Sequence, residues 1–125
     1  MRIRAAVLTV SDKGFAGERE DVSGPTLASA LREMGAEVIE QLIVPDEQDR
    51  IVDTLTRLAY SGDLDLVITT GGTGPAPRDH TPEATQRVID RQIPGLAEVL
   101  PLEGYRKTPL AVLSRGVAGL CRKCL

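Results

Sequence analysis

Hydrophobic and polar positions divide the chain into two kinds of alternating segment. Short, nearly continuous apolar runs, each of a length typical of a buried strand, cover residues 3–10 and 64–68. Residues 37–44 show a mixed apolar and polar pattern that suits an edge strand or a half-covered one. Elsewhere apolar residues recur every three or four positions, as on one face of a helix, over residues 23–35, 47–60 and 82–90. This alternation predicts an α/β fold, specifically a three-layer α/β/α sandwich with a mainly parallel sheet and right-handed crossovers.

Residues at the ends of these segments support the predicted helices. Ser23 and Thr81 stand where helix N-caps are expected, and Pro82 occupies the first turn of the helix that Thr81 would begin. Gly35 stands where a left-handed residue commonly ends a helix, and Gly62 follows the second helical pattern. Each predicted helix therefore has a start or a stop signal of its own.

The last third of the chain gives weaker patterns. Pro94 and Gly95 interrupt the third helix before a shorter helical segment at residues 96–100. Residues 110–113 suit either a helix end or a short strand. Residues 117–120 suggest a strand that runs into a turn.

Composition narrows the class of protein. A chain of 125 residues with 42% hydrophobic and 26% charged residues is typical of a single globular domain. The net charge of -3, with only one Phe and two Tyr, argues against a nucleic-acid partner. No apolar run approaches the ~18 residues of a membrane span, and the N-terminus lacks a signal-peptide pattern. We expect a cytoplasmic protein that binds neither nucleic acid nor membrane.

Cys121 and Cys124 form a C-x-x-C pair near the end of the sequence. A zinc site needs about four ligands, and His80 is the only other soft ligand in the chain. A redox C-x-x-C is expected near the start of a helix inside a βαβ unit. We interpret the pair as incidental and assign it no role.

The most informative motif is T-T-G-G-T-G-P-A-P-R-D-H-T-P-E-A at residues 69–84. It lies between a predicted strand and a predicted helix, where open α/β sheets bind their ligands. Its glycines permit positive φ angles and close approach of the backbone, so exposed N–H groups would suit phosphate oxygens. The motif is neither the dinucleotide fingerprint nor a P-loop. A tight turn would explain the glycines equally well, but a turn requires neither Arg78 nor Asp79.

This stretch resembles the T-x-G-G-T-G-x-x-x-R-D-x-T-P-E-A signature of the molybdopterin-binding MogA/MoaB family. That family includes the molybdopterin adenylyltransferases and the gephyrin G domain. Other segments resemble the family in the family's order, namely Ser11-Asp12 with Gly14, residues 21–25, residues 44–47 and residues 113–119. The resemblance covers most of the chain.

The resemblance implies a role in molybdenum cofactor biosynthesis. The implied reaction is Mg²⁺-dependent adenylyl transfer from ATP to molybdopterin, with release of pyrophosphate. Such transfers depend on alignment of the reactants and on neutralisation of phosphate charge, with Mg²⁺ held by one or two carboxylates. One alternative is a non-catalytic pterin- or nucleotide-binding module of the same fold. Another is a CinA-like nucleotide pyrophosphate hydrolase, although the chain lacks a second domain.

Three carboxylates, Asp12, Asp46 and Asp79, follow the three predicted strands. In a parallel sheet they would gather at one edge. Asp46 and Asp79 match family positions that are catalytic, so the resemblance implies that they hold Mg²⁺ or position the reactants. There are simpler interpretations, in which Asp46 is a helix N-cap, Asp79 pairs with Arg78 or supports its loop, and Asp12 is an ordinary loop residue.

The other predicted site residues would contact substrate or nucleotide. Backbone amides of the glycine loop would hold phosphates, and the guanidinium of Arg78 would offset their charge. Arg78 would otherwise form a surface ion pair, and Ser114 with Arg115 would be a solvated strand end. The predicted binding residues are Ser11, Asp12, Gly71, Gly72, Thr73, Gly74, Arg78, Ser114 and Arg115.

The resemblance also bears on assembly and length. It implies a homotrimer or a higher homo-oligomer. The family continues through a further strand, a loop and a C-terminal helix, and we expect a single domain over residues 1–125 that lacks these elements. An open strand edge and exposed apolar surface are then expected.

Overall fold

Three parallel strands form the main sheet of the computed structural model, which describes residues 2–125. Their bounds are Arg4–Val10 for β1, Glu37–Val44 for β2 and Leu66–Thr70 for β3. β1 is central, with β2 on one side and β3 on the other. Val10 lies opposite Val44 in β2, and Thr9 lies opposite Thr70 in β3. The carboxyl ends of all three strands therefore lie at one edge of the sheet.

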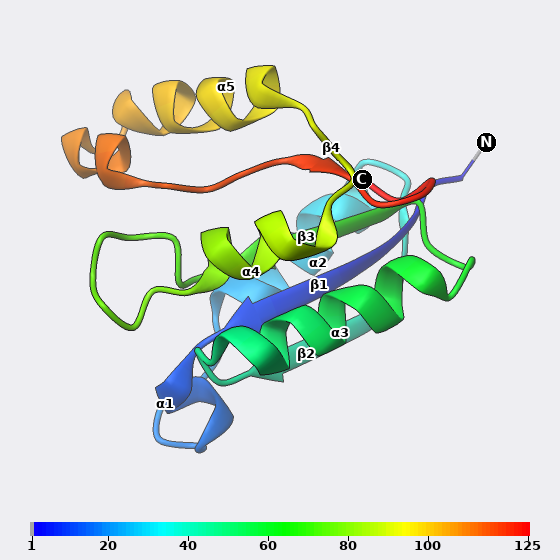
Figure 1. Ribbon diagram of the computed structural model, residues 1–125, viewed down its shortest axis with the longest axis horizontal. Helices are drawn as coiled ribbons and strands as arrows, with labels where there is room; N and C mark the ends of the chain where they lie inside the picture. The colour runs from blue at the N-terminus through cyan, green and yellow to red at the C-terminus, as the bar shows by residue number, and fades with distance from the viewer. Residues whose placement is uncertain (1) are drawn as a thin grey trace.

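Helices follow each of these strands. They are α1 (Asp12–Phe15) and α2 (Ser23–Glu33) after β1, α3 (Gln48–Tyr60) after β2, and α4 (Thr81–Val88) after β3. α2 covers one face of the sheet, whereas α3 and α4 pack together on the other (Figure 1). The predicted three-layer α/β/α sandwich with a parallel sheet is confirmed.

The alternation of side chains along β1 divides the core between the two faces. Leu8 belongs to a buried cluster with Ile51 of α3, whereas Val7 belongs to a separate one with Leu31 of α2. A strand that is buried on both faces needs apolar residues at nearly every position. This explains the continuous apolar run at the start of the sequence.

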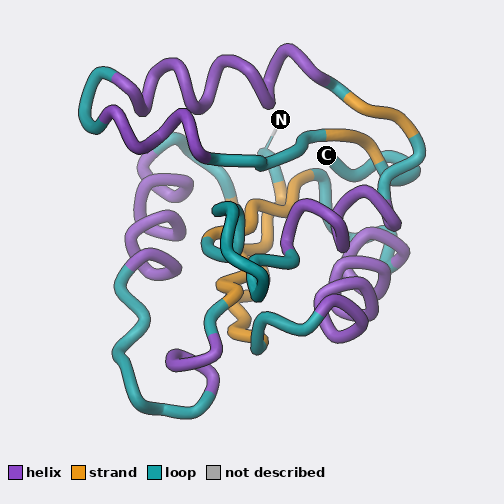
Figure 2. Tube along the Cα trace, turned by 60° about the vertical axis from the view of Figure 1, so that its left-hand side comes forward, coloured by secondary structure: helices purple, strands orange, loops and turns teal. Residues whose placement is uncertain are grey.

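The chain after α4 forms a small second sheet and an arm. Its elements are β4 (Arg91–Gln92), α5 (Pro94–Tyr105), the 3₁₀-helix η1 (Pro109–Leu113) and β5 (Gly119–Leu120). β4 and β5 pair in antiparallel fashion, and α5 and η1 extend from them as an arm (Figure 2). In residues 2–125 we find no helix with the length and apolar character needed to cross a membrane.

Two predicted helix caps are wrong. Ser23 lies inside the first turn of α2, where Oδ1 of Asp21 accepts the N–H of Gly24 at 3.1 Å. Thr81 uses its hydroxyl to donate a hydrogen bond to the carbonyl of Gly71 at 2.9 Å. A carboxylate is a stronger acceptor than a serine hydroxyl, and a partly buried carbonyl requires a donor.

The predicted segments after residue 90 also need correction. α5 extends to Tyr105, well past the predicted residues 96–100. Its apolar residues show no clear helical period and Pro101 stands in its interior, so the sequence pattern did not indicate its full length. Residues 110–113 fall within η1, so the helical alternative is correct for them. The predicted loop before Asp21 contains α1, which is too short to show any periodicity.

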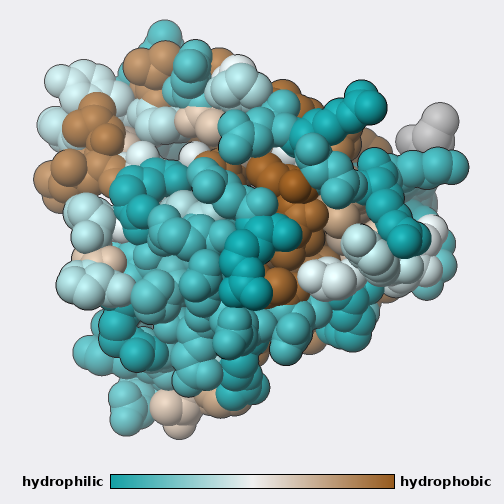
Figure 3. Space-filling model, in the orientation of Figure 1, coloured by the Kyte–Doolittle hydropathy of each residue, from teal (hydrophilic) through white to brown (hydrophobic). Residues whose placement is uncertain are grey.

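The arm exposes a hydrophobic surface. Leu100 and Leu102 of α5, with Leu110 and Val112 of η1, have exposed fractions between 62% and 71%. Figure 3 shows hydrophobic side chains at the surface over this arm. An apolar cleft of about 390 Å³ also lies beside β3 and α5. The expected exposed apolar surface is therefore present.

Cys121 and Cys124 are opposed in a tight antiparallel turn. Both are free and buried, and Cys124 packs in a cluster with Ala6 and Leu58. Burial raises the pKa of both thiols. In this structure they pack as small apolar side chains.

Candidate functional site

A cleft of about 550 Å³ opens at the carboxyl ends of β1 and β3. Its lining comes from the end of β1, the polar loop before α2 and the start of the glycine loop. The residues that contribute to these three walls include Ser11, Arg19, Asp21, Gly71 and Gly72. This is the sheet edge at which the ligand site was predicted.

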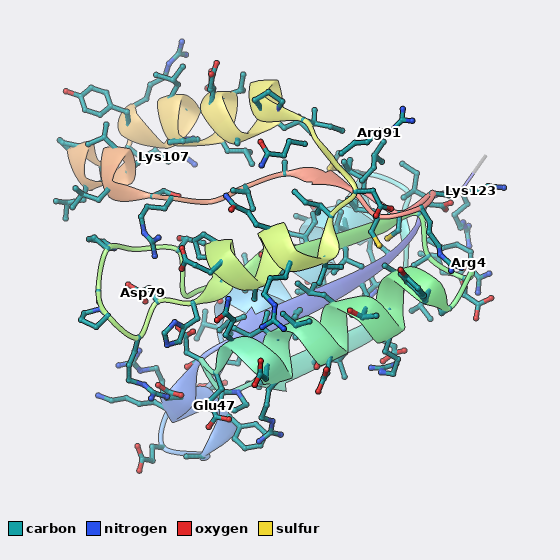
Figure 4. The ribbon with its side chains drawn as sticks, viewed as in Figure 1. Arg4, Glu47, Asp79, Arg91, Lys107 and Lys123 are labelled. Atoms are coloured by element: carbon teal, nitrogen blue, oxygen red, sulfur yellow. The ribbon has the colours of Figure 1, made fainter. Side chains whose placement is uncertain are left out.

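Figure 4 shows the polar side chains around this edge. Asp79 and Glu47 lie at this end, on the loops after β3 and β2. Arg4 and Lys123 lie at the opposite end of the sheet. The carboxylates that follow the strands are therefore separated from the charged groups near the strand starts.

Gly71 and Gly72 turn the chain sharply as it leaves β3. Their φ angles are 93° and 66°, a region that side chains disfavour. A Cβ on Gly71 would collide with the carbonyl oxygen of Val10, and one on Gly72 would collide with the hydroxyl of Thr81. Both conformation and space therefore require glycine at these positions.

Asp46 is a buried carboxylate beside Gly72. It is only 6% exposed, and its Oδ1 accepts the backbone N–H of His80 at 2.9 Å. Its Oδ2 lies so close to Gly72 that a Cβ there would approach to 2.8 Å. Burial raises the pKa of Asp46, and the negative charges of Asp79 and Asp12 act in the same direction. Carboxylates in such environments are frequent at functional sites.

Arg78 forms a two-point ion pair with Asp12. Its Nε donates to Oδ2 and its NH2 group to Oδ1, both at 2.9 Å. The backbone N–H of Asp46 donates to the same Oδ1 at 2.9 Å. The Arg78 guanidinium holds the pKa of Asp12 below its usual value. The structure thus brings Asp12, Asp46 and Arg78 together, whereas the alternative pairing of Arg78 with Asp79 is wrong.

Asp79 and Arg115 stabilise the glycine loop itself. Oδ2 of Asp79 accepts the N–H of Ala76 at 3.0 Å. Arg115 donates to the carbonyl oxygens of Gly74 and Asp79, both at 2.9 Å, and pairs with Glu83 at 2.6 Å. The Arg115 guanidinium lowers the pKa of Glu83. Arg115 therefore directs its donors to protein acceptors and connects the loop to α4.

The two predicted serines lie in different places. Ser11 lines the cleft, and its hydroxyl oxygen accepts the N–H of Gly14 at 3.0 Å as the N-cap of α1. Ser114 lies at the exposed end of η1. Its neighbour Arg115 donates its backbone N–H to the carbonyl of Thr73 at 2.8 Å.

Asp21 is a residue of the cleft that the sequence reasoning did not place in the site. Its Oδ2 accepts the hydroxyl of Thr9 at 2.9 Å, while Oδ1 accepts the N–H of Gly24. These bonds fix the N-terminus of α2 at the cleft wall. The available signal was a carboxylate two positions before a predicted helix start.

The residues present can supply part of a magnesium site. Within residues 2–125, no group of three or more His, Cys, Asp or Glu side chains is arranged to hold a metal ion. Mg²⁺ usually takes one or two protein carboxylates and completes its shell with water and substrate phosphates. Asp46 and Asp79 offer carboxylate oxygens next to the glycine loop. This donor set fits a cation that is shared with a phosphate ligand.

A parallel sheet, a glycine loop and grouped carboxylates at the strand ends are typical of α/β domains that bind phosphorylated small molecules. The family model described as "probable molybdopterin binding domain" matches residues 6–123. The chain belongs to this family, and the predicted MogA/MoaB membership is confirmed.

Similar proteins support this membership. The chain is 41% identical to the molybdopterin adenylyltransferase of Helicobacter pylori, over 98% of this chain and 71% of that enzyme. It is 52% identical to the molybdopterin biosynthesis enzyme MoaB of Thermus thermophilus, with a TM-score of 0.84 over 98% of this chain and 77% of that one. A molybdopterin biosynthesis protein from Mycobacterium abscessus is 39% identical, with a TM-score of 0.91 over 98% and 77%.

Proposed function

We propose that this chain transfers the adenylyl group of ATP to molybdopterin in molybdenum cofactor biosynthesis. A phosphate oxygen of molybdopterin bonds to the α-phosphorus of ATP, and the bond from that phosphorus to the β-phosphate oxygen breaks, so pyrophosphate leaves. The observation that carries the proposal is the group formed by Asp12, Asp46 and Arg78 beside the glycine loop. The 41% identity to a molybdopterin adenylyltransferase supports the same reaction.

The glycine loop and its neighbours suit the polyphosphate of ATP. Backbone N–H groups of Gly71, Gly72, Thr73 and Gly74 would donate to phosphate oxygens. The guanidinium of Arg78 would neutralise part of their charge. Donors that are fixed before the reaction stabilise charge on phosphate oxygens without further rearrangement. The cleft beside Gly71 and Gly72 offers space for the substrate.

Asp46 and Asp79 are the residues that would hold Mg²⁺. When bound, the cation supplies charge neutralisation at the phosphate oxygens of the reacting and leaving groups. The burial that raises the pKa of Asp46 makes its charged form costly without a cation nearby. Binding of a cation and ionisation of Asp46 would therefore favour each other.

The proposal is tested by incubating the protein with molybdopterin, ATP and Mg²⁺. We expect adenylated molybdopterin and pyrophosphate in equal amounts. Asp46→Ala and Asp79→Ala should each lower kcat by at least about 100-fold, a loss typical of removing a group that acts mainly in the transition state. Their affinities for ATP, measured by calorimetry, should change by far less.

Asp53→Ala is the matched control, because Asp53 is an exposed carboxylate on α3. It should retain the activity of the unsubstituted protein. Binding of both substrates without any product would overturn the catalytic proposal in favour of a binding module. Equal losses of affinity and kcat in the Asp46 and Asp79 variants would contradict their proposed roles.

We also propose that the chain forms a homo-oligomer, as family resemblance implies a trimer or a larger assembly. Leu100, Leu102, Leu110 and Val112 on the arm are exposed by more than 60% and provide a surface of suitable apolar character. Size-exclusion chromatography with light scattering tests this directly. A mass of 13.4 kDa in solution, equal to one chain, would overturn it.

A further inference from the structure

We infer that Asp12 is a positioning residue, which fixes Asp46 and Arg78 in their working geometry and does not itself bind substrate. Sequence reasoning placed Asp12 among the binding residues. This inference rests on the proposed adenylyl transfer, because Asp46 and Arg78 are assigned their roles in that reaction.

Both oxygens of the Asp12 carboxylate are engaged by protein donors. Oδ1 accepts from the backbone N–H of Asp46 and from NH2 of Arg78, and Oδ2 accepts from Nε of Arg78, all at 2.9 Å. Parallel bonds from a guanidinium to both oxygens of a carboxylate fix their relative orientation. Neither oxygen of Asp12 is left without a protein donor. Its local chemistry therefore suits holding other groups better than contacting substrate.

The same bonds connect three segments that are distant in sequence. Asp12 follows β1, Asp46 follows β2, and Arg78 belongs to the loop after β3. A further bond runs from the N–H of His80 to Oδ1 of Asp46 at 2.9 Å. NH2 of Arg78 also donates to the carbonyl of Asp46 at 3.3 Å. Asp12 thus holds the backbone of Asp46 on one side, and the glycine loop holds its carboxylate on the other.

The ion pair between Arg78 and Asp12 mainly fixes the positions of these groups and adds little to folding stability. The side chains of Arg78 and Asp12 are 63% and 43% exposed, and pairs of this exposure add little to folding stability. Group-transfer reactions are, by contrast, very sensitive to position, since a displacement of about 1 Å can cost roughly 100-fold in rate. Loss of Asp12 should therefore reduce the rate far more than it reduces stability.

Asp12→Ala and Asp12→Asn separate the two functions of the carboxylate. Alanine removes the acceptor for Asp46 and the partner of Arg78, whereas asparagine keeps an oxygen acceptor and loses the charge. We expect Asp12→Ala to lower kcat by about 30-fold or more while KM for ATP changes by less than about 3-fold, as for a group whose effect is felt mainly in the transition state. Asp12→Asn should recover part of the lost kcat. An increase in KM with an unchanged kcat would show a substrate ligand and overturn the inference, as would full activity of Asp12→Ala.

Amide hydrogen exchange of Asp46, followed by NMR, provides a readout that does not depend on activity. Its N–H is bonded to Asp12, so Asp12→Ala should accelerate exchange at this amide by about 10-fold or more. Asp12→Asn should preserve most of the protection. Amides in the centre of β1 should exchange as before, and a uniform acceleration would indicate general destabilisation and overturn the local role. Unchanged exchange at Asp46 in Asp12→Ala would also overturn it.

Asp49→Ala is the matched control for loss of an ion pair. Asp49 pairs with Arg87 at 3.0 Å on the exposed side of α3 and α4. This variant should retain kcat and the slow exchange of Asp46. If the unsubstituted protein shows no adenylyl transfer, the proposed function fails, whereas the exchange measurements still decide whether Asp12 positions Asp46.

Discussion

At Gly71 both the backbone conformation and the surrounding space exclude any other side chain. Its φ angle is 93°, and a Cβ would collide with the carbonyl of Val10. We expect Gly71→Ala to lower the free energy of unfolding by more than about 2 kcal/mol, because a strained φ and a backbone clash add together. Urea denaturation measures this loss. Gly95→Ala is the control, since nothing lies within 4 Å of a Cβ at Gly95, and its stability should equal or exceed that of the unsubstituted protein.

Asp46 should limit stability at neutral pH. Its folded-state pKa is raised above 3.8 by burial, so the folded chain holds this proton more tightly than the unfolded chain. The free energy of unfolding therefore falls as the pH rises from the unfolded-state pKa of Asp46 toward its higher folded-state pKa. The whole of this loss in stability is present at neutral pH. Asp46→Asn keeps an acceptor for His80 and removes the charge.

We expect Asp46→Asn to melt at a higher temperature than the unsubstituted protein at about pH 7. The difference should narrow as the pH is lowered toward about 4, because the unsubstituted carboxyl becomes neutral as well. Thermal melts across this range provide the measurement. An equal difference at every pH would mean that desolvation of the charge is not the cause.

Individual site residues were predictable to an unequal degree. Asp12 and Asp46 follow predicted strands, so a parallel sheet places them at one edge, and the structure joins them by a hydrogen bond. The partner of Arg78 was not predictable, because Asp79 is adjacent in sequence while Asp12 is 66 positions away. Asp21 was missed for a related reason, since its bond to Thr9 depends on how α2 packs against β1.

At the scale of elements, Arg115 connects the glycine loop to α4. Its guanidinium bonds to Gly74, Asp79 and Glu83. Arg115→Lys keeps the charge but loses the planar fork of donors that reaches all three. We expect faster hydrogen exchange across residues 72–80, measured by mass spectrometry, with α3 unchanged.

Arg57→Lys is the control for this element-scale effect. Arg57 also makes two bonds to one carboxylate, that of Glu40, at 3.2 and 3.3 Å, but far from the loop. In the Arg57→Lys variant, amide hydrogen exchange across residues 72–80 should match that of the unsubstituted chain. Equal exchange in Arg115→Lys would mean that Arg115 does not restrain the loop.

Strands and helices were predictable where burial of one face gives a periodic sequence pattern, or where burial of both faces gives a continuous apolar run. β2 begins and ends where its mixed apolar and polar pattern indicates, and α3 differs by one residue from the predicted start. α5 was predicted too short because its apolar residues do not form a stripe. η1 is too short for its pattern to distinguish a helix from a strand. The cap of α4 was mispredicted because Thr81 bonds to Gly71, ten positions away, whereas at α2 the local rule applies to Asp21 and not to Ser23.

At the scale of the whole molecule, the arm should mediate self-association. Leu102 is 65% exposed and Leu110 is 71% exposed on α5 and η1. We expect Leu102→Glu with Leu110→Glu to shift the molecular mass toward that of one chain in light scattering. The melting temperature measured at low concentration should change little, because neither side chain is buried in the single chain.

Met34→Glu is the control for added surface charge. Met34 is 83% exposed at the end of α2, away from the arm. The mass of the Met34→Glu variant in solution should remain that of the unsubstituted protein. A similar loss of assembly in both variants would assign the effect to charge and not to the arm.

The central position of β1 has a consequence for biosynthesis. The ribosome makes β1 before either of its partners, and β3 ends about 60 residues later. At synthesis rates of about 5–20 residues per second, the strand waits roughly 3–12 s before both edges can be paired. During that interval the largely apolar segment of β1 has no complete sheet to enter. Nascent chains of this protein should therefore depend on chaperones that shield short hydrophobic segments at the ribosome exit.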